Sequence, residues 1–323
     1  MMMADGTKIE WTDATVNFWW GCTKVGPGCD HCYAETWSKR TGGNHWGVGV
    51  PRRKIASAVK TLHRLDNDHA WWAADCEIGQ LHDHSRRRVF IQSMSDLFDN
   101  EVPAEWFDEA WTTIGRCNRL EIQIVTKRIS FVEKRLRGRP WPKHAGLIIS
   151  IVNQDEANRD IPRLLDLKAR LGIPWVGLSM EPMLGPVDLG QLLDNCPVNG
   201  WLTWLDALDW VICGGESGPK ARPMHPDWAR ALRDQCGAAG VPFFFKQWGE
   251  WFPGEIDNHS DGSGWCAYPD IDHDPSADRW EGRWTHSADQ GGHLRVGKKR
   301  AGRRLDNQLH DGFPSIEQRN IDA

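Results

Sequence analysis

Short apolar segments alternate with helical stretches along most of this chain, and this alternation constrains the fold more than any other feature. Each segment is rich in β-forming residues and is followed by a polar loop and then by a stretch with helical spacing. Segments that are apolar throughout are typical of parallel strands buried on both faces. Six of them follow residue 87, at 89–91, 121–125, 147–152, 175–178, 210–212 and 241–245.

The stretches between these segments carry helix signals. One begins with Pro103, and others end just before a glycine, which favours the left-handed conformation that closes many helices. The expected helices cover 103–117, 130–137, 155–171 and 226–239. The sequence therefore predicts an α/β fold with a parallel sheet covered by helices, either open and doubly wound or curled into a full or partial barrel.

Two regions lie outside this repeat. Residues 41–86 are expected to form an inserted helical or loop segment within a barrel domain of residues 1–250. Residues 251–323 are expected to form a separate C-terminal extension that is polar at first and then basic from Arg295 to Arg304. The interspersed Gly and Asp residues favour an ordinary solvated surface for the basic segment, with contact to nucleic acid as the alternative.

Polar or charged residues, or glycines, follow the six predicted strands. Because the carboxyl ends of parallel strands meet at one rim, the set predicts a pocket there, and the alternative is that the strands simply end in polar loops. Four charged side chains are candidates for binding or protonating a substrate, or else for ion pairs: Lys127, Glu181, Glu216 and Lys246. The other pocket candidates are Ser93, Ser95, Asp96, Ser150, Asn153, Gly214 and Gly215.

Three cysteines near the start of the chain form the sharpest local motif. Cys22, Cys29 and Cys32 have the spacing C-x6-C-x2-C, and Gly26-Pro27-Gly28 allows the intervening backbone to fold sharply. Such a loop can wrap a metal. The favoured interpretation is an iron-sulfur cluster with one iron left open for a small molecule. Zinc completed by His31 or a distant ligand, or three unliganded thiols, are the alternatives.

Composition limits the class of protein. A net charge of -5 argues against a surface that grips nucleic acid all over. The 20 Trp against 2 Tyr favour core packing over base stacking. The apolar segments are much shorter than the ~20 residues of a membrane span, and the start of the chain lacks a basic segment followed by an apolar one. We therefore expect a cytoplasmic protein with reduced cysteines and no membrane partner.

The residues around the cysteines resemble the opening of an uncharacterised bacterial and phage family named after phage gene products thirty-seven and sixty-eight. The likeness begins at Ile9-Glu10-Trp11-Thr12-Asp13 and includes Cys29-Asp30-His31-Cys32-Tyr33. That family is in turn similar to the radical S-adenosylmethionine enzymes. The likeness covers most of the chain, through Ser93-Met94-Ser95-Asp96, Thr126-Lys127-Arg128, Ser179-Met180-Glu181-Pro182, Gly214-Gly215-Glu216-Ser217 and Phe245-Lys246-Gln247.

This resemblance implies a partial (β/α)6 TIM-like barrel with a cluster loop after the first strand. It also implies that the three cysteines hold a [4Fe-4S] cluster whose open iron binds S-adenosylmethionine. By position, the segment with Ser93, Ser95 and Asp96 would face the methionine amino group. The ribose would then lie near Ser150 or Asn153, and the adenine near the backbone of Gly214 and Gly215.

The function expected from the resemblance is a radical S-adenosylmethionine enzyme. A 5'-deoxyadenosyl radical would abstract hydrogen from an unidentified substrate, with nucleic acids and nucleotides among the candidates, and a reductant such as flavodoxin or ferredoxin would supply electrons. The main alternative is a phage-associated nucleic-acid-binding protein that zinc stabilises, without radical chemistry. A divalent-metal hydrolase ranks last, because no paired-carboxylate spacing supports it.

Overall fold

The computed structural model describes residues 7–77, 86–192, 202–253, 255–258, 264–267, 284–287 and 291–314. The chain divides into two compact units. The first consists of Met1–Ser150 and Arg159–Ser179, and the second of Ile151–Asn158 and Met180–Ala323. The expected domain boundary at residue 250 remains a prediction.

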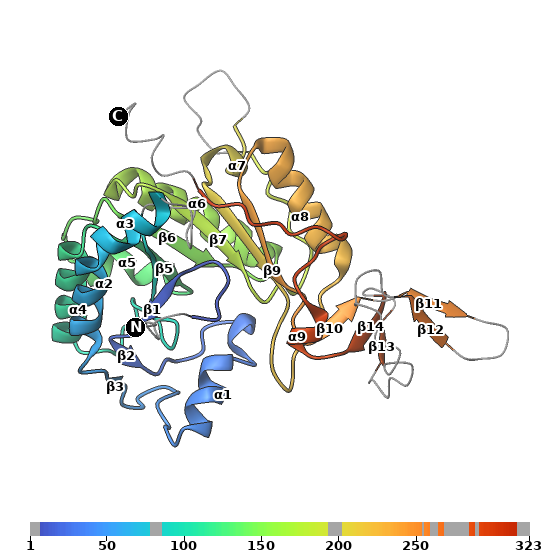
Figure 1. Cartoon of the computed structure of the whole chain (residues 1–323), viewed down its shortest axis with the longest axis horizontal. Coiled ribbons are helices and arrows are strands. Elements are labelled where there is room, and N and C mark those ends of the chain that lie inside the picture. Colours follow the sequence, from blue (N-terminus) through green and yellow to red (C-terminus); the bar gives the residue numbers. More distant parts are fainter. Residues whose placement is uncertain are drawn as a thin grey trace. The chain divides into compact units, whose positions relative to one another are not determined.

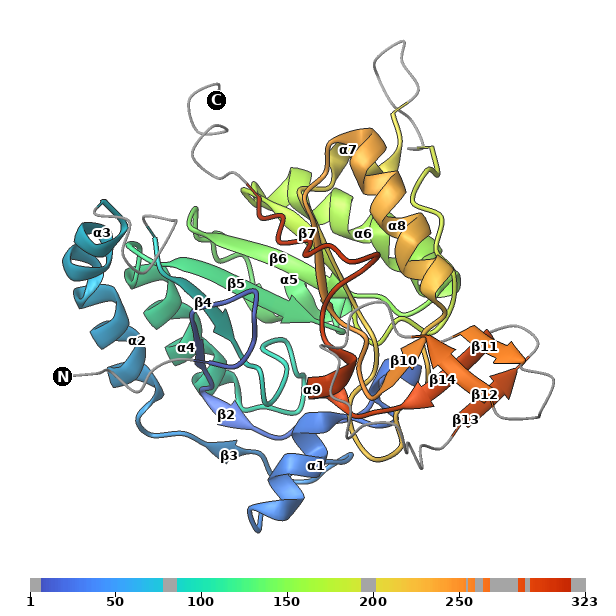
Figure 2. The ribbon, with the colours of Figure 1, turned by 45° about the vertical axis from the view of Figure 1, so that its right-hand side comes forward.

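Parallel strands form the centre of the first unit and follow one another in chain order. Val89 lies opposite both Ala14 and Ile122, and Ile148 lies opposite both Val125 and Gly177. Every side chain of the strand 145–150 is buried, as expected for a strand covered on both faces. Figure 2 shows four of the strands, β4 to β7, side by side. The strands are β1 (Ala14–Val16), β4 (Arg88–Ile91), β5 (Glu121–Thr126), β6 (Ala145–Ser150) and β7 (Val176–Met180).

Helices cover these strands with amphipathic faces. α4 (Ala104–Arg116) buries Phe107, Ala110, Trp111 and Ile114, a spacing of three and four residues that puts them on one face. α2 (Ala58–Asn67) lies beside α4 in Figure 1. The remaining helical segments that begin in this unit or cross into it are η1 (Pro27–Cys29), α1 (Tyr33–Arg40), α3 (His69–Glu77), η2 (Ile129–Phe131), α5 (Val132–Leu136) and α6 (Gln154–Leu171).

Aromatic side chains fill much of the core. The ring of Trp111 lies 5.7 Å from that of Phe107 and 5.2 Å from that of Trp141, measured between centroids. Ten of the 20 tryptophans are buried among the described residues. The prediction that tryptophan serves mainly in packing is therefore confirmed for these ten positions.

The second unit contains two further parallel strands, β8 (Trp210–Gly214) and β9 (Phe243–Gln247). Part of the predicted C-terminal extension packs on β9, because the Phe245 N–H donates to the His310 carbonyl at 2.9 Å. The 14-residue helix α8 (Pro226–Ala239) ends at Gly240, whose φ is +69°. The other elements are α7 (Trp204–Ala207), β10 (Trp251–Pro253), β11 (Glu255–Asn258), β12 (Gly264–Ala267), β13 (Trp284–Ser287), β14 (Gly291–Arg295) and α9 (Lys298–Ala301).

The fold class is the expected one, an α/β fold with parallel strands in a partial TIM-like barrel. Each of the six predicted strands is observed within about two residues of its expected position, and the four predicted helices are present. The inserted segment forms β3 (Arg53–Lys54), α2 and α3. Among the described residues no helix has the length and apolar character of a membrane span.

Candidate functional site

The first parallel strand, β1, ends at Val16, and the cysteine loop, residues 21–32, follows after a short antiparallel strand. β2 (Trp19–Trp20) leads into Gly21, which forms a parallel bridge with Ser95. The Gly21 N–H also donates to the Met94 carbonyl at 3.2 Å. The loop is thus attached to the segment that follows β4, so the two segments lie together.

Gly21 is required at this point by two separate features. Its φ is +107°, and a Cβ added there would lie 2.2 Å from the carbonyl oxygen of His45. We expect Gly21→Ala to lower the free energy of unfolding by roughly 1–3 kcal/mol through strain and overpacking. Urea denaturation would measure this loss.

Gly42→Ala is a matched control for that substitution. Gly42 also has a positive φ, +83°, but a Cβ there would meet nothing within 4 Å. Its loss should be about 1 kcal/mol, from backbone strain alone. Equal losses for the two variants would show that the contact with His45 is unimportant.

The second half of the loop is compact. η1 turns the chain, with the Cys29 N–H donating to the Gly26 carbonyl at 2.9 Å. Cys32 is the N-cap residue of α1, and its carbonyl accepts from the Thr36 N–H at 3.2 Å. One tight turn therefore joins Cys29 to the start of α1.

The three thiols are free and half-buried. Cys22 and Cys32 pack against the same small apolar cluster of Ala34, Trp46 and Met94. Within the described ranges no three His, Cys, Asp or Glu side chains form a group that could hold one metal ion. The three thiols therefore do not converge on a single metal ion in this structure.

Burial and nearby charges shift the pKa of two of these thiols, Cys22 and Cys32. Burial raises the pKa of Cys22 to about 12, and Asp96 and Asp99 add to the rise, whereas Arg128 lowers it. Burial also raises the pKa of Cys32, while hydrogen bonds from the Glu35 and Ala34 backbone and, to a smaller extent, Lys127 lower it. The two consecutive cations after β5 thus offset part of the effect of burial at two different cysteines.

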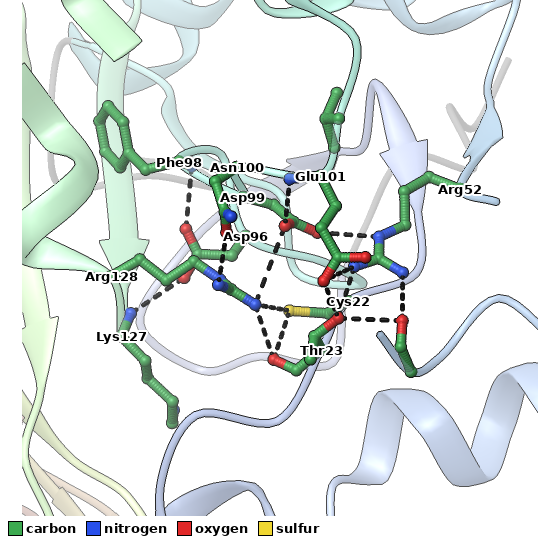
Figure 3. Close-up of polar contacts among 12 residues, drawn as sticks. Cys22, Thr23, Arg52, Asp96, Phe98, Asp99, Asn100, Glu101, Lys127 and Arg128 are labelled. Carbon is green, nitrogen blue, oxygen red and sulfur yellow. Dashed lines mark hydrogen bonds and ion pairs between the residues drawn. The ribbon is translucent and has the colours of Figure 1, made fainter. Parts of the chain in front are cut away.

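Arg128 holds the first cysteine through several contacts. Its Nη2 lies 3.7 Å from the Cys22 Sγ and donates to the Thr23 carbonyl at 2.7 Å. Its Nη1 donates to the Asn100 Oδ1 at 3.1 Å, and Nη2 lies 3.8 Å from an Asp99 carboxylate oxygen. Figure 3 shows this guanidinium approaching Cys22 and Thr23 from one side.

Arg52 reaches the same segment from the other side in Figure 3. Its Nε donates to Asp99 at 2.8 Å, and its Nη2 donates to the Thr23 Oγ1 at 2.7 Å. Both partners of the Arg52–Asp99 pair are almost fully buried. Asp99 therefore links two guanidinium groups behind the first cysteine.

Asp96 is buried and strongly hydrogen-bonded. Its carboxylate accepts from the Thr126 Oγ1 at 2.9 and 3.0 Å and from the backbone N–H groups of Lys127, at 3.0 Å, and Phe98, at 2.9 Å. Burial raises the pKa of this carboxyl, while Arg128 and these donors lower it. In the structure Asp96 joins the ends of β4 and β5.

The serines predicted for the pocket also lie beside the cysteine loop. The Asn17 amide donates to the Ser93 Oγ at 3.0 Å, and the Ser95 Oγ donates to the Trp19 carbonyl at 2.9 Å. The Tyr33 hydroxyl donates to the Ser93 carbonyl at 2.7 Å. The structure thus brings Ser93, Ser95, Asp96 and Lys127 together with the cysteines.

Two charged candidates pair within the second unit. The Lys246 Nζ lies 2.7 Å from both carboxylate oxygens of Glu181, and the Gln247 amide donates to Glu181 at 3.1 Å. Glu216 pairs separately, accepting from the Arg222 Nη2 at 2.6 Å. The three predicted charges form ion pairs, and a role toward substrate remains a prediction.

Gly214, the last residue of β8, and Gly215, which follows it, lie beside the end of β9. A Cβ on Gly215 would lie 1.9 Å from the Trp248 carbonyl oxygen, whereas one on Gly214 would make ordinary contacts at 3.5 Å or more. Close packing alone thus accounts for glycine at position 215. The predicted contact of these glycines with adenine stays untested.

The ribose candidates have structural contacts of their own. Ser150 ends β6 and lies opposite Ser179 of β7. The Asn153 Oδ1 accepts from the Glu156 N–H at 3.0 Å, in the first turn of α6. Their roles toward a cofactor remain predictions.

The basic segment near the C-terminus is partly committed to internal contacts. The Arg295 Nη2 donates to the Gly218 carbonyl at 2.9 Å, and Arg303 pairs with Asp311. Lys299 and Arg300 are exposed. Contact of this segment with nucleic acid also remains a prediction.

Sequence reasoning did not select Asn17, Arg52, Asp99 or Arg128 as site residues. Arg128 stood in the Thr126-Lys127-Arg128 block, so its place after a predicted strand was an available signal. Arg52 lies in the inserted segment, where no pattern pointed to it.

Comparisons with known proteins give one family and one group of similar folds. A family model described as "Protein of unknown function (DUF5131)" matches residues 6–314. No curated protein matches the sequence. A spore photoproduct lyase mutant is similar with 14% identity and a TM-score of 0.36, over 91% of this chain and 71% of that chain. A second mutant of that lyase, with bound AdoMet and dinucleoside spore photoproduct, has 12% identity and a TM-score of 0.35, over 90% and 70%.

Proposed function

Because the chain belongs to the family described as a protein of unknown function (DUF5131), we propose its activity from its own residues. We propose that it is a radical S-adenosylmethionine enzyme in which Cys22, Cys29 and Cys32 hold a [4Fe-4S] cluster. Its electrons would come from a low-potential donor of the flavodoxin or ferredoxin class. The single observation that carries the proposal is the loop of three free, half-buried cysteines, in which the Cys22 sulfur lies 3.7 Å from the Arg128 Nη2.

The donor set fits such a cluster in chemical terms. Thiolates are the ligands that iron-sulfur clusters require, and three of them leave one iron open. All three thiols lie on one loop, and Cys22 and Cys32 pack against the same apolar cluster. Ligand binding must release the thiol protons, and Arg128 and Lys127 offset part of the burial that raises the pKa of Cys22 and Cys32.

When bound, such a cluster supplies the electron that cleaves S-adenosylmethionine into methionine and a 5'-deoxyadenosyl radical. The chain's own residues would position the reactants. The hydroxyls of Ser93 and Ser95 lie beside the loop, where a methionine group would be held. Asp96 already accepts hydrogen bonds from three residues. We therefore assign it the structural role of holding the ends of β4 and β5 together.

Metal and sulfide analysis tests this proposal directly. Protein purified without oxygen and reconstituted with iron and sulfide is expected to hold about four of each per chain. With dithionite and S-adenosylmethionine it should release 5'-deoxyadenosine, which chromatography would detect. One zinc per chain without sulfide would contradict the proposal and favour the zinc-stabilised protein.

A further inference from the structure

Two polar contacts involve the Cys22 sulfur itself: its thiol donates to the Thr23 carbonyl at 3.6 Å, and the Arg128 guanidinium brings a charged donor to it. The distance from Nη2 to Sγ is 3.7 Å, within hydrogen-bonding range for a sulfur acceptor. A guanidinium donates more strongly to an ionised acceptor than to a neutral one. The contact therefore favours a sulfur that carries negative charge.

Arg128 is fixed before any ligand arrives. The Thr23 carbonyl, the Asn100 amide oxygen and the Asp99 carboxylate surround its terminal nitrogens. Its backbone N–H donates to the Thr126 Oγ1 at 2.8 Å, which also binds Asp96. The side chain is 5% exposed, so its charge is poorly screened by water.

We propose that Arg128 is a positioning residue that tunes the reduction of the metal centre through the Cys22 sulfur. This inference rests on the proposed function, since it requires a redox centre on that sulfur. Reduction adds one electron to the centre from an external reductant such as dithionite, and no bond to the protein forms or breaks. Arg128 stabilises the reduced centre more than the oxidised one, because the added negative charge falls partly on the sulfur it contacts.

The test is a redox titration of the reconstituted protein, followed by the electron paramagnetic resonance of the reduced cluster. Near the midpoint of the wild type, Arg128→Met should lower the ratio of reduced to oxidised cluster about tenfold, which is 59 mV for one electron. Arg128→Lys keeps the charge but loses the forked donor, and should lower the ratio about threefold. If Arg128→Met does not fold, the redox titration of Arg128→Lys tests the proposal.

Arg135→Lys is the matched control. Arg135 is also a buried arginine, but its Nη1 donates to the Val102 carbonyl at 3.1 Å, outside the cysteine loop. Its ratio should stay within about twofold of the wild type. An unchanged ratio in both Arg128 variants, or an equal shift in Arg135→Lys, overturns the inference.

The wild type separates this inference from the proposed function. If the wild type holds iron and sulfide and the Arg128 variants titrate like it, only the role of Arg128 is wrong. If the wild type holds zinc or no metal, both are wrong, and the iron, sulfide and zinc content shows this before any titration.

Discussion

Single replacement of Cys22, Cys29 or Cys32 by alanine is expected to remove the cluster almost completely. Loss of an outer-shell partner already weakens metal sites by about 10–100-fold, so loss of a ligand should exceed about 100-fold. After reconstitution and desalting, each variant should hold little iron or sulfide and form no 5'-deoxyadenosine. Iron and sulfide analysis per chain measures the effect.

Cys76→Ala provides the control for these variants. Cys76 is also a free, half-buried thiol, but it lies in α3, outside the cysteine loop. Its removal should leave iron, sulfide and 5'-deoxyadenosine at wild-type levels. Full cluster content in any loop variant would exclude that cysteine as a ligand. Equal losses in Cys76→Ala would point to general instability.

The α/β fold could be predicted from sequence because most of its strands are continuously apolar segments and its helices are amphipathic. β6 is buried along its whole length, and α4 has a clear apolar stripe. β1 was not selected, since Ala14-Thr15-Val16 is short and partly polar. It is a strand because it pairs with β4, about 75 residues further along the chain. Pairing with a strand so far along the chain produces no pattern in the residues of β1 itself.

The candidate site was predictable only in part, for a related reason. The rule that strands end at a common rim placed Asp96 and Lys127 near one another, and the structure links them by a hydrogen bond. The same rule does not say whether a polar residue holds the fold or faces a ligand. Asp96 and Glu181 both have protein partners that the sequence could not reveal.

The charge network behind Cys22 was invisible in the sequence for a different reason. Arg52 and Asp99 are 47 residues apart, and neither belongs to a periodic pattern. Charged residues are rarely fully buried, so the sequence predicts that Arg52 and Asp99 lie on the surface. Only the structure shows that Arg52, from the inserted segment, binds Asp99, which follows β4.

Asp99→Asn is expected to lower the free energy of unfolding by about 3–5 kcal/mol, the cost of breaking a buried ion pair by removing one partner. The Asp99 side chain is fully buried, and it accepts from Arg52 at 2.8 Å and lies 3.8 Å from Arg128. The amide keeps the shape but removes the charge, which leaves two guanidinium groups without their shared counterion. Urea denaturation at neutral pH measures the loss.

Asp166→Asn is the surface counterpart of this substitution. Asp166 also pairs with an arginine, Arg170 at 2.7 Å, but its side chain is 58% exposed. Its loss should not exceed about 1 kcal/mol, because water screens exposed pairs. Similar losses in the two variants would show that burial of the Asp99 charge does not matter.

A double substitution separates the charge from the packing at Asp99. If the cost of Asp99→Asn comes from uncompensated buried cations, removing one of them should recover part of it. Arg52→Met combined with Asp99→Asn is therefore expected to cost less than the sum of the single variants, by about 1–3 kcal/mol. Additive losses would mean that the two side chains act independently. Recovery would establish that Arg52 is held in the core by this carboxylate, which also stands beside the arginine that contacts Cys22.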